Sequence, residues 1–237
     1  MTEQYIVLDL ETTGLSPRND RILEIGAAKV TDGCVQEVYQ TFVDPRMRIP
    51  ERITELTGIT DEMVCGQKSN EQAVRELVEF CGNLPLLGHN ILFDYGFVKY
   101  SAVNLGIPFE RNGIDTLRIA RELLPAEEKK SLEALCSRFS ISREHAHRAL
   151  DDALATHELY MALERMCPEE KETLFVPSPL ICRVKRQGDI TPAQKGYLKD
   201  LVTYHKIELE IDPESLTKNE ASRLIDKIIL NYGKIRR

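Results

Sequence analysis

The sequence predicts a mixed α/β layer fold, because strand-like segments open the chain and helices interleaved with short strands follow. Residues 5–10 form a continuous apolar run, as expected of a strand buried on both faces. Residues 21–31 and 34–43 are two more strand candidates, and Asp32 and Gly33 between them are a strong hairpin signal. The chain therefore begins as a three-strand meander rather than as a parallel βαβ unit.

Helical spacing of apolar residues predicts the elements after residue 70. Residues 85–88 are a short strand candidate. Asn90 and Asp115 are expected to cap the helices that they begin. The predicted helices span residues 70–82, 90–103, 115–124, 131–139 and 149–166.

The last quarter of the chain predicts a separate helical unit. Residues 168–190 hold three prolines and no helical period, which is typical of a linker or an extended strap. Thr191 and Thr217 each begin a capping box, and each is followed by an apolar stripe at helical spacing. We therefore expect a domain at 1–167, a linker at 168–190 and a small helical hairpin at 191–237.

Composition and charge narrow the class of protein. The 237 residues are 42% hydrophobic and 29% charged, as in an ordinary globular protein, and the net charge is −7. Residues 183–237 hold twelve Lys and Arg against eight Asp and Glu, so the remainder is strongly acidic. An acidic domain needs bound cations or local basic residues to hold a polyanion. No apolar run has membrane-spanning length, and six scattered cysteines predict a reducing compartment, the cytoplasm.

Two acids end the first strand. Asp9 and Glu11 are separated by one residue, so both side chains lie on one face of the strand. Adjacent carboxylates repel unless a proton or a cation lies between them, and hard oxygen ligands suit Mg²⁺ or Mn²⁺. Taken alone, the pair is equally well explained as the acidic turn that ends a strand.

Other acids and a histidine offer partners for this pair. Asp94 lies one turn after Asn90 in the segment HNILFD, and Asp152 follows His147 in the segment HRALDDA. His147 and Asp152 converge only if the histidine lies in the loop and the acid in the first helical turn. Singly, Asp94 is also explained as an exposed helix acid, His147 as a loop histidine, and Asp152 as a helix-start acid that serves the helix dipole.

The segments DLETTGL, HNILFD and HRALDDA resemble the three motifs of the DEDDh 3′→5′ exonucleases, in order and spacing. That group includes the proofreading subunits and domains of bacterial replicative polymerases, RNase T and oligoribonuclease. Residues 53–63 are most similar to the exonuclease domain of Gram-positive replicative polymerases. The resemblance covers about residues 4–166 and implies an RNase H-like fold, a five-stranded mixed sheet flanked by helices.

The resemblance also implies a catalytic centre with two divalent ions, Mg²⁺ or Mn²⁺. Asp9 would bridge both ions, and Glu11 with Asp152 would complete the site of the ion that holds the nucleophilic water. Asp94 would hold the second ion. His147 would be the general base, because an imidazole titrates near neutral pH. Asp151 is an alternative to Asp152, and the family spacing selects Asp152.

Five further residues are candidate substrate contacts by the same resemblance. The backbone at Thr12 would bind the terminal nucleotide, Leu15 would wedge against the last bases, and His89, Asn90 and Phe93 would line the strand path. Asn90 is equally well explained as a helix cap and Phe93 as a core residue.

The sequence leaves three functions open. The first is a 3′→5′ exonuclease on single-stranded DNA ends in proofreading or repair, working with a replication or repair protein and without a membrane. The second is an exoribonuclease similar to RNase T or oligoribonuclease. The third is a non-catalytic nucleic-acid-binding module, in which the basic helical hairpin carries the interaction with nucleic acid or a partner.

Overall fold

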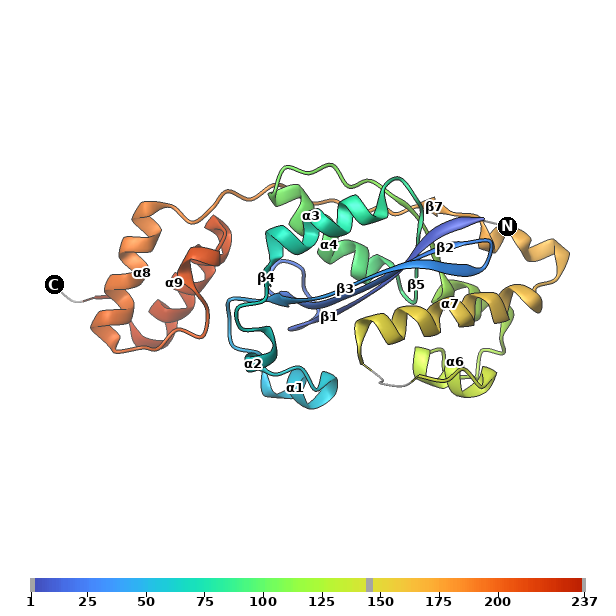
Figure 1. Cartoon of the computed structure of the whole chain (residues 1–237). Coiled ribbons are helices and arrows are strands. Elements are labelled where there is room, and N and C mark those ends of the chain that lie inside the picture. The colour runs from blue at the N-terminus through green and yellow to red at the C-terminus, as the bar shows by residue number, and fades with distance from the viewer. Residues whose placement is uncertain (1–2, 144–146, 236–237) are drawn as a thin grey trace.

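A mixed β-sheet lies at the centre of the computed structural model, which describes residues 3–143 and 147–235 (Figure 1). Its strand order is β4-β3-β2-β1-β5-β6-β7. β1 is antiparallel to β2 and parallel to β5, so the sheet is mixed as predicted. The strands are β1 (Gln4–Thr12), β2 (Ile22–Thr31), β3 (Cys34–Asp44), β4 (Lys68–Ser69), β5 (Leu86–Gly88), β6 (Asn112–Asp115) and β7 (Ser178–Pro179).

The expected strand count of five is too low. Seven strands are present among the described residues, and the two extra ones, β4 and β7, are two-residue pairings at the sheet edges. Such short pairings carry no alternating pattern that a sequence could display. The five strands between them form the expected sheet.

Helices cover both faces of the sheet (Figure 1). α3 and α4 pack on one face, and α7 packs on the other together with α5 and α6. The helices of this part are α1 (Glu51–Thr57), α2 (Asp61–Val64), α3 (Asn70–Cys81), α4 (Leu92–Asn104), α5 (Thr116–Leu123), α6 (Leu132–Phe139) and α7 (Ala149–Arg165). The short α1 and α2 were not predicted.

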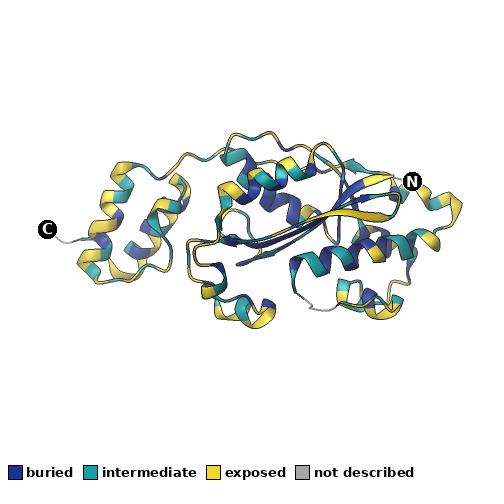
Figure 2. Ribbon diagram, in the orientation of Figure 1, coloured by how far each residue is buried: buried dark blue, intermediate teal, exposed yellow. Residues whose placement is uncertain are grey.

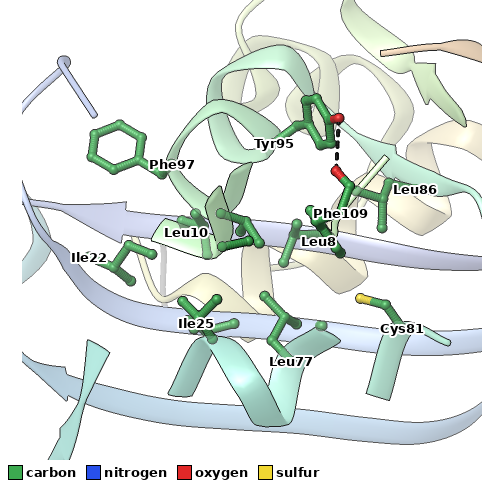
Figure 3. Close-up of a cluster of buried hydrophobic side chains, with 14 of the residues drawn as sticks. Leu8, Leu10, Ile22, Ile25, Leu77, Cys81, Leu86, Tyr95, Phe97 and Phe109 are labelled. Atoms are coloured by element: carbon green, nitrogen blue, oxygen red, sulfur yellow. Dashed lines mark hydrogen bonds between the residues drawn. The ribbon is translucent and has the colours of Figure 1, made fainter. Parts of the chain in front are cut away.

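Side chains of β1 alternate between two hydrophobic cores. Leu8 and Leu10 point toward α3 and α4, where they pack with Leu77 and Tyr95 (Figure 3). The Tyr95 hydroxyl donates a hydrogen bond of 3.1 Å to the backbone oxygen of Phe109, which fixes α4 to the segment before β6 (Figure 3). Tyr5 and Val7 of the same strand belong to the core under α7, so the next residues of that row, Asp9 and Glu11, face α7 as well.

The start of α4 differs from the prediction. The helix begins at Leu92, not at Asn90, and Asn90 has a left-handed backbone with φ of 69°. Its N–H donates a 2.9 Å hydrogen bond to the Asp115 carboxylate, which also caps α5 by accepting from Leu117 N. Asp115 is therefore an N-cap, as predicted, and its tertiary bond to Asn90 holds that residue outside the helix.

The segment expected to be a linker packs partly against the large domain. It forms η1 (Glu169–Phe175) and the edge strand β7. Phe175 is buried in the core under α7, and Leu180 is buried in the core that contains α3 and α4. The segment therefore contributes to both main cores. The boundaries at 167 and 190 stay a prediction.

The C-terminal residues form a helical hairpin with a core of its own. α8 (Pro192–His205) and α9 (Lys218–Tyr232), joined through η2 (Pro213–Ser215), bury Leu198, Leu201 and Ile225 between them. Both predicted capping boxes are present, at Thr191 and Thr217.

Ion pairs fasten this hairpin to the large domain. Arg21 and Glu220 are 2.8 Å apart and both are largely buried, and Arg46 pairs with Asp212 at 2.9 Å. Figure 2 shows buried residues following the sheet and the inner faces of the flanking helices, with exposed residues along the outside. Within the described parts of the chain, we find no helix long and apolar enough to cross a membrane.

Candidate active site

The beginning of α7 lies directly on the sheet at the row that contains Asp9. In the β1–β2 pairing, Asp9 is opposite Gly26 and Glu11 is opposite Glu24. A Cβ atom on Gly26 would lie 2.1 Å from Leu150 N and 2.2 Å from the carbonyl carbon of Ala149. Only a glycine allows this approach, which places the first turn of α7 next to the two β1 acids.

Three predicted site residues converge there. Glu11, His147 and Asp152 each offer a ligand atom, and these atoms all lie within 4.8 Å of one another. His147 lies before the helix in the left-handed conformation, with φ of 63°, and Asp152 is buried in the first turn of α7. Arg143 Nη1 donates to Asp152 Oδ1 at 2.9 Å.

Asp94 approaches from the opposite side of β1. It occupies the first turn of α4, is 3% exposed, and accepts a 3.0 Å hydrogen bond from the backbone N–H of Leu10. Leu10 lies between Asp9 and Glu11, so this bond ties Asp94 to the strand that carries these two acids.

Burial raises the pKa of all four acids, and repulsion by neighbouring carboxylates adds to this effect at Asp9, Glu11 and Asp94. Burial, followed by the charges of Asp94, Glu11 and Asp152, raises the pKa of Asp9 well above its ordinary value. Burial and then the charge of Asp152 raise the pKa of Glu11 to about 7.

Hydrogen bonds and an arginine only partly offset this effect at the other two acids. Burial raises the pKa of Asp94, although the bond from Leu10 N acts in the other direction. Burial also raises the pKa of Asp152, against the opposing charge of Arg143. The protein thus holds the four carboxylates together at a cost in repulsion, which protons or cations relieve.

This donor set suits hard divalent cations. Carboxylate oxygens with one imidazole are ligands that Mg²⁺ and Mn²⁺ accept, and the cluster contains no thiolate among the described residues. Repulsion among the acids is the electrostatic condition that a cation corrects. The residues present therefore fit such ions.

The candidate substrate contacts on the β1–β2 loop have contrasting environments. The Thr12 side chain is buried and donates a 2.7 Å hydrogen bond to Gly14 O, so it holds the turn. Leu15, three residues further along the chain, is an apolar side chain that is 84% exposed.

The contacts predicted around the second motif are tied to the protein. Both His89 ring nitrogens are engaged, Nδ1 with Thr116 Oγ1 at 2.9 Å and Nε2 with Lys130 O at 2.8 Å. Phe93 is half-buried and its ring centroid lies 5.1 Å from that of Phe97, on the α4 core. Asn90 is exposed, and its side chain does not cap α4.

Sequence reasoning missed four residues that shape this site: Glu24, Gly26, Arg143 and Arg148. A signal for two of them was present, because Glu24 and Gly26 interrupt the apolar residues of the segment 22–28. The two arginines gave none, since surface arginines are common and both lie in a loop.

Comparison with known proteins agrees with this geometry. The exonuclease family of the RNase_T type matches residues 6–160. The PolC-type DNA polymerase III of Clostridium perfringens is 42% identical over 170 residues, which are 72% of this chain and 12% of that protein. The PolC-type polymerase of Thermotoga petrophila is 38% identical over 163 residues, 68% of this chain and 12% of the relative. The chain thus spans about an eighth of these relatives.

Solved structures share the fold. Exonuclease I of E. coli in complex with a dT13 oligonucleotide has a TM-score of 0.64 at 19% identity, over 73% of this chain and 44% of that one. Exonuclease X in complex with a 5′ overhanging duplex DNA has a TM-score of 0.54 at 26% identity, over 68% of this chain and 90% of that one. With its family match, its PolC-type relatives and this shared fold, the chain belongs to the DnaQ-like 3′→5′ exonuclease family.

Proposed function

We propose that this enzyme hydrolyses phosphodiester bonds at the 3′ ends of single-stranded DNA and releases nucleoside 5′-monophosphates. The observation that carries the proposal is the cluster of Glu11, His147 and Asp152 within 4.8 Å, beside the half-buried Asp9 and the buried Asp94. Four carboxylates held together against their own repulsion favour binding of cations rather than a structural role.

The carboxylates would hold two divalent ions, Mg²⁺ or Mn²⁺. Asp9 would contact both, Glu11 and Asp152 would hold one, and Asp94 would serve the other. Ions bound there would activate the attacking water and neutralise charge on the leaving oxygen. His147 would accept the proton of the attacking water, which its place beside Glu11 and Asp152 allows.

Substrate binding would use the rim of this site. The backbone at Thr12 would hold the terminal nucleotide, and the exposed Leu15 would pack against the last bases. His89, Asn90 and Phe93 are weaker candidates. His89 is bound on both ring nitrogens, which leaves its ring face rather than its nitrogens for a substrate.

DNA is the favoured substrate because the relatives point to it. The sequence relatives are DNA polymerases, and two solved structures of the fold contain DNA. A cytoplasmic role with a replication or repair protein follows from the same relatives and is part of the proposal. The helical hairpin, α8 and α9, would serve nucleic-acid or partner docking.

The test is an assay on paired DNA and RNA oligomers of one sequence, labelled at the 3′ or the 5′ end, with Mg²⁺ or Mn²⁺. We expect mononucleotides from the 3′ label first, a shortening ladder from the 5′ label, and faster turnover of DNA. Asp9→Ala should be inactive. Faster turnover of RNA would select the exoribonuclease, and no turnover with either metal would select the non-catalytic module.

A further inference from the structure

Glu24 is a buried acid that the proposed reaction does not use. It lies on β2 opposite Glu11 and is 0% exposed. A carboxylate in this position needs several donors to offset its loss of water. Its partners therefore indicate why the fold retains it.

All of these partners are donors, and most come from the junction before α7. Glu24 Oε1 accepts from Arg148 Nη2 at 2.9 Å and from Gln40 Nε2 at 2.8 Å. Glu24 Oε2 accepts from Arg148 Nε at 3.1 Å and from the backbone N–H of Ala149 at 3.3 Å. Four bonds occupy both oxygens, so this carboxylate has no free site for a metal ion.

The partners occupy the short stretch between two members of the candidate site. Arg148 directly follows His147, and Ala149 is the first residue of α7, three positions before Asp152. The side chain of the N-cap residue Arg148 does not cap the helix. Glu24 on the neighbouring strand instead supplies the acceptor for the first helical N–H, that of Ala149. The Arg148 guanidinium also lies 5.1 Å from the centre of the Phe42 ring on β3.

We propose that Glu24 is a positioning residue. Its two hydrogen bonds with the Arg148 guanidinium, here called the fork, and its bond to Ala149 N set the position and rotation of the first turn of α7. In this position His147 and Asp152 face Glu11. This inference rests on the proposed function of those residues. It predicts that loss of the fork weakens metal binding and the chemical step without weakening binding of the oligonucleotide.

The primary variant is Glu24→Gln, which keeps the shape and removes the charge and one acceptor. We expect kcat on single-stranded DNA to fall about 10- to 100-fold, the range seen when a residue that orients a metal ligand is lost. KM for the strand should change little. Mn²⁺ binding by calorimetry should weaken by a similar factor, and amide hydrogen exchange should speed up at residues 150–153.

A matched control separates this role from general destabilisation. Glu110→Gln also removes the carboxylate partner of a buried cation, Lys99, in the middle of α4. That variant should lose stability while its Mn²⁺ affinity and kcat stay at the wild-type values. A second pair, Arg148→Met and Arg148→Lys, tests the fork from its other side. Lysine should restore part of the activity that methionine removes.

Outcomes for the inference and for the proposed function are distinct. Wild-type kcat and Mn²⁺ affinity in folded Glu24→Gln would overturn the positioning role. If that variant does not fold, wild-type values in Arg148→Met would do the same. If the wild-type protein releases no nucleotide, the proposed function fails, and Mn²⁺ binding with exchange at residues 150–153 still decides the role of Glu24.

Discussion

Gly26→Ala should disable the enzyme although Gly26 has no side chain that could take part in the reaction. The alanine Cβ would lie 2.1 Å from Leu150 N, 2.2 Å from Ala149 C and 2.4 Å from Ala149 O. All three are backbone atoms of the α7 start, so no side-chain rotation relieves the overlap. Either β2 or the first turn of α7 has to move.

The size of the effect follows from these distances. Ordinary contact begins near 3.4 Å, so the helix start must retreat by roughly 1 Å. Overpacking of this kind costs about 1–3 kcal/mol of stability, and a catalytic group misplaced by about 1 Å costs roughly 100-fold in rate. The displaced segment carries His147 and Asp152, so the loss should appear in kcat.

The assay is release of a 3′-terminal label from single-stranded DNA, with the thermal unfolding temperature measured in parallel. Gly196→Ala is the matched control, because a Cβ there meets nothing within 4 Å and a helical alanine stabilises. It should keep wild-type kcat and unfold at the same or a higher temperature. Gly26→Ala with wild-type kcat would refute the claim that glycine at this position sets the approach of α7.

Three other predictions address the acids and the hairpin. Asp152→Asn should lower kcat for nucleotide release at least about 100-fold. Asp151→Asn should keep most activity, because Asp151 lies about 100° round the helix from Asp152. Equal losses in the two variants would contradict the assignment of Asp152 over Asp151. Without metal, the folded protein holds the proton of Glu11 more tightly than the unfolded chain does, because the pKa is about 7 against 4.5. The folded state is therefore fully stable, in this respect, below pH 4.5, and it loses that stability as the pH rises to 7. The stability of Glu11→Gln in EDTA should therefore rise relative to the wild type by about 3 kcal/mol as the pH increases from 4.5 to 7, and a difference independent of pH would contradict the raised pKa. Arg21→Met leaves Glu220 buried with its Thr217 bonds but without its cationic partner, and should loosen the hairpin by about 3 kcal/mol or more, seen as faster proteolysis near residues 183–190. Unchanged proteolysis would contradict this anchoring.

The sequence was sufficient for the parts of the fold that have a periodic pattern. β1 to β3, α3 and α7 appear close to their predicted bounds, because each has several residues that alternate or repeat with helical spacing. The Thr191 and Thr217 capping boxes were equally readable, since their bonds are local in sequence.

Features that depend on tertiary contacts could not be read in this way. Asn90 looks like a helix cap, but a bond to Asp115, distant in sequence, places it in a left-handed turn. The edge strands β4 and β7 consist of two residues each and exist only because a neighbour pairs with them. Local propensity carries no information about such partners.

The candidate site shows the same division. Its motif acids and His147 were identified by resemblance, and their roles stay predictions. In the sequence, Glu24 and Gly26 stand out only as a charged residue and a glycine among apolar residues. Their roles depend on the packing of α7 against that strand. The supporting residues therefore needed the structure.

The most direct test of a divalent-ion centre is the number of Mn²⁺ ions that the protein binds, measured by calorimetric titration of the wild type and of Asp9→Asn. We expect two ions per wild-type chain, because Asp94, Glu11 and Asp152 surround Asp9, and loss or marked weakening of binding in the variant. Absence of binding to the wild type, or equal binding by Asp9→Asn, would contradict a divalent-ion centre at these acids.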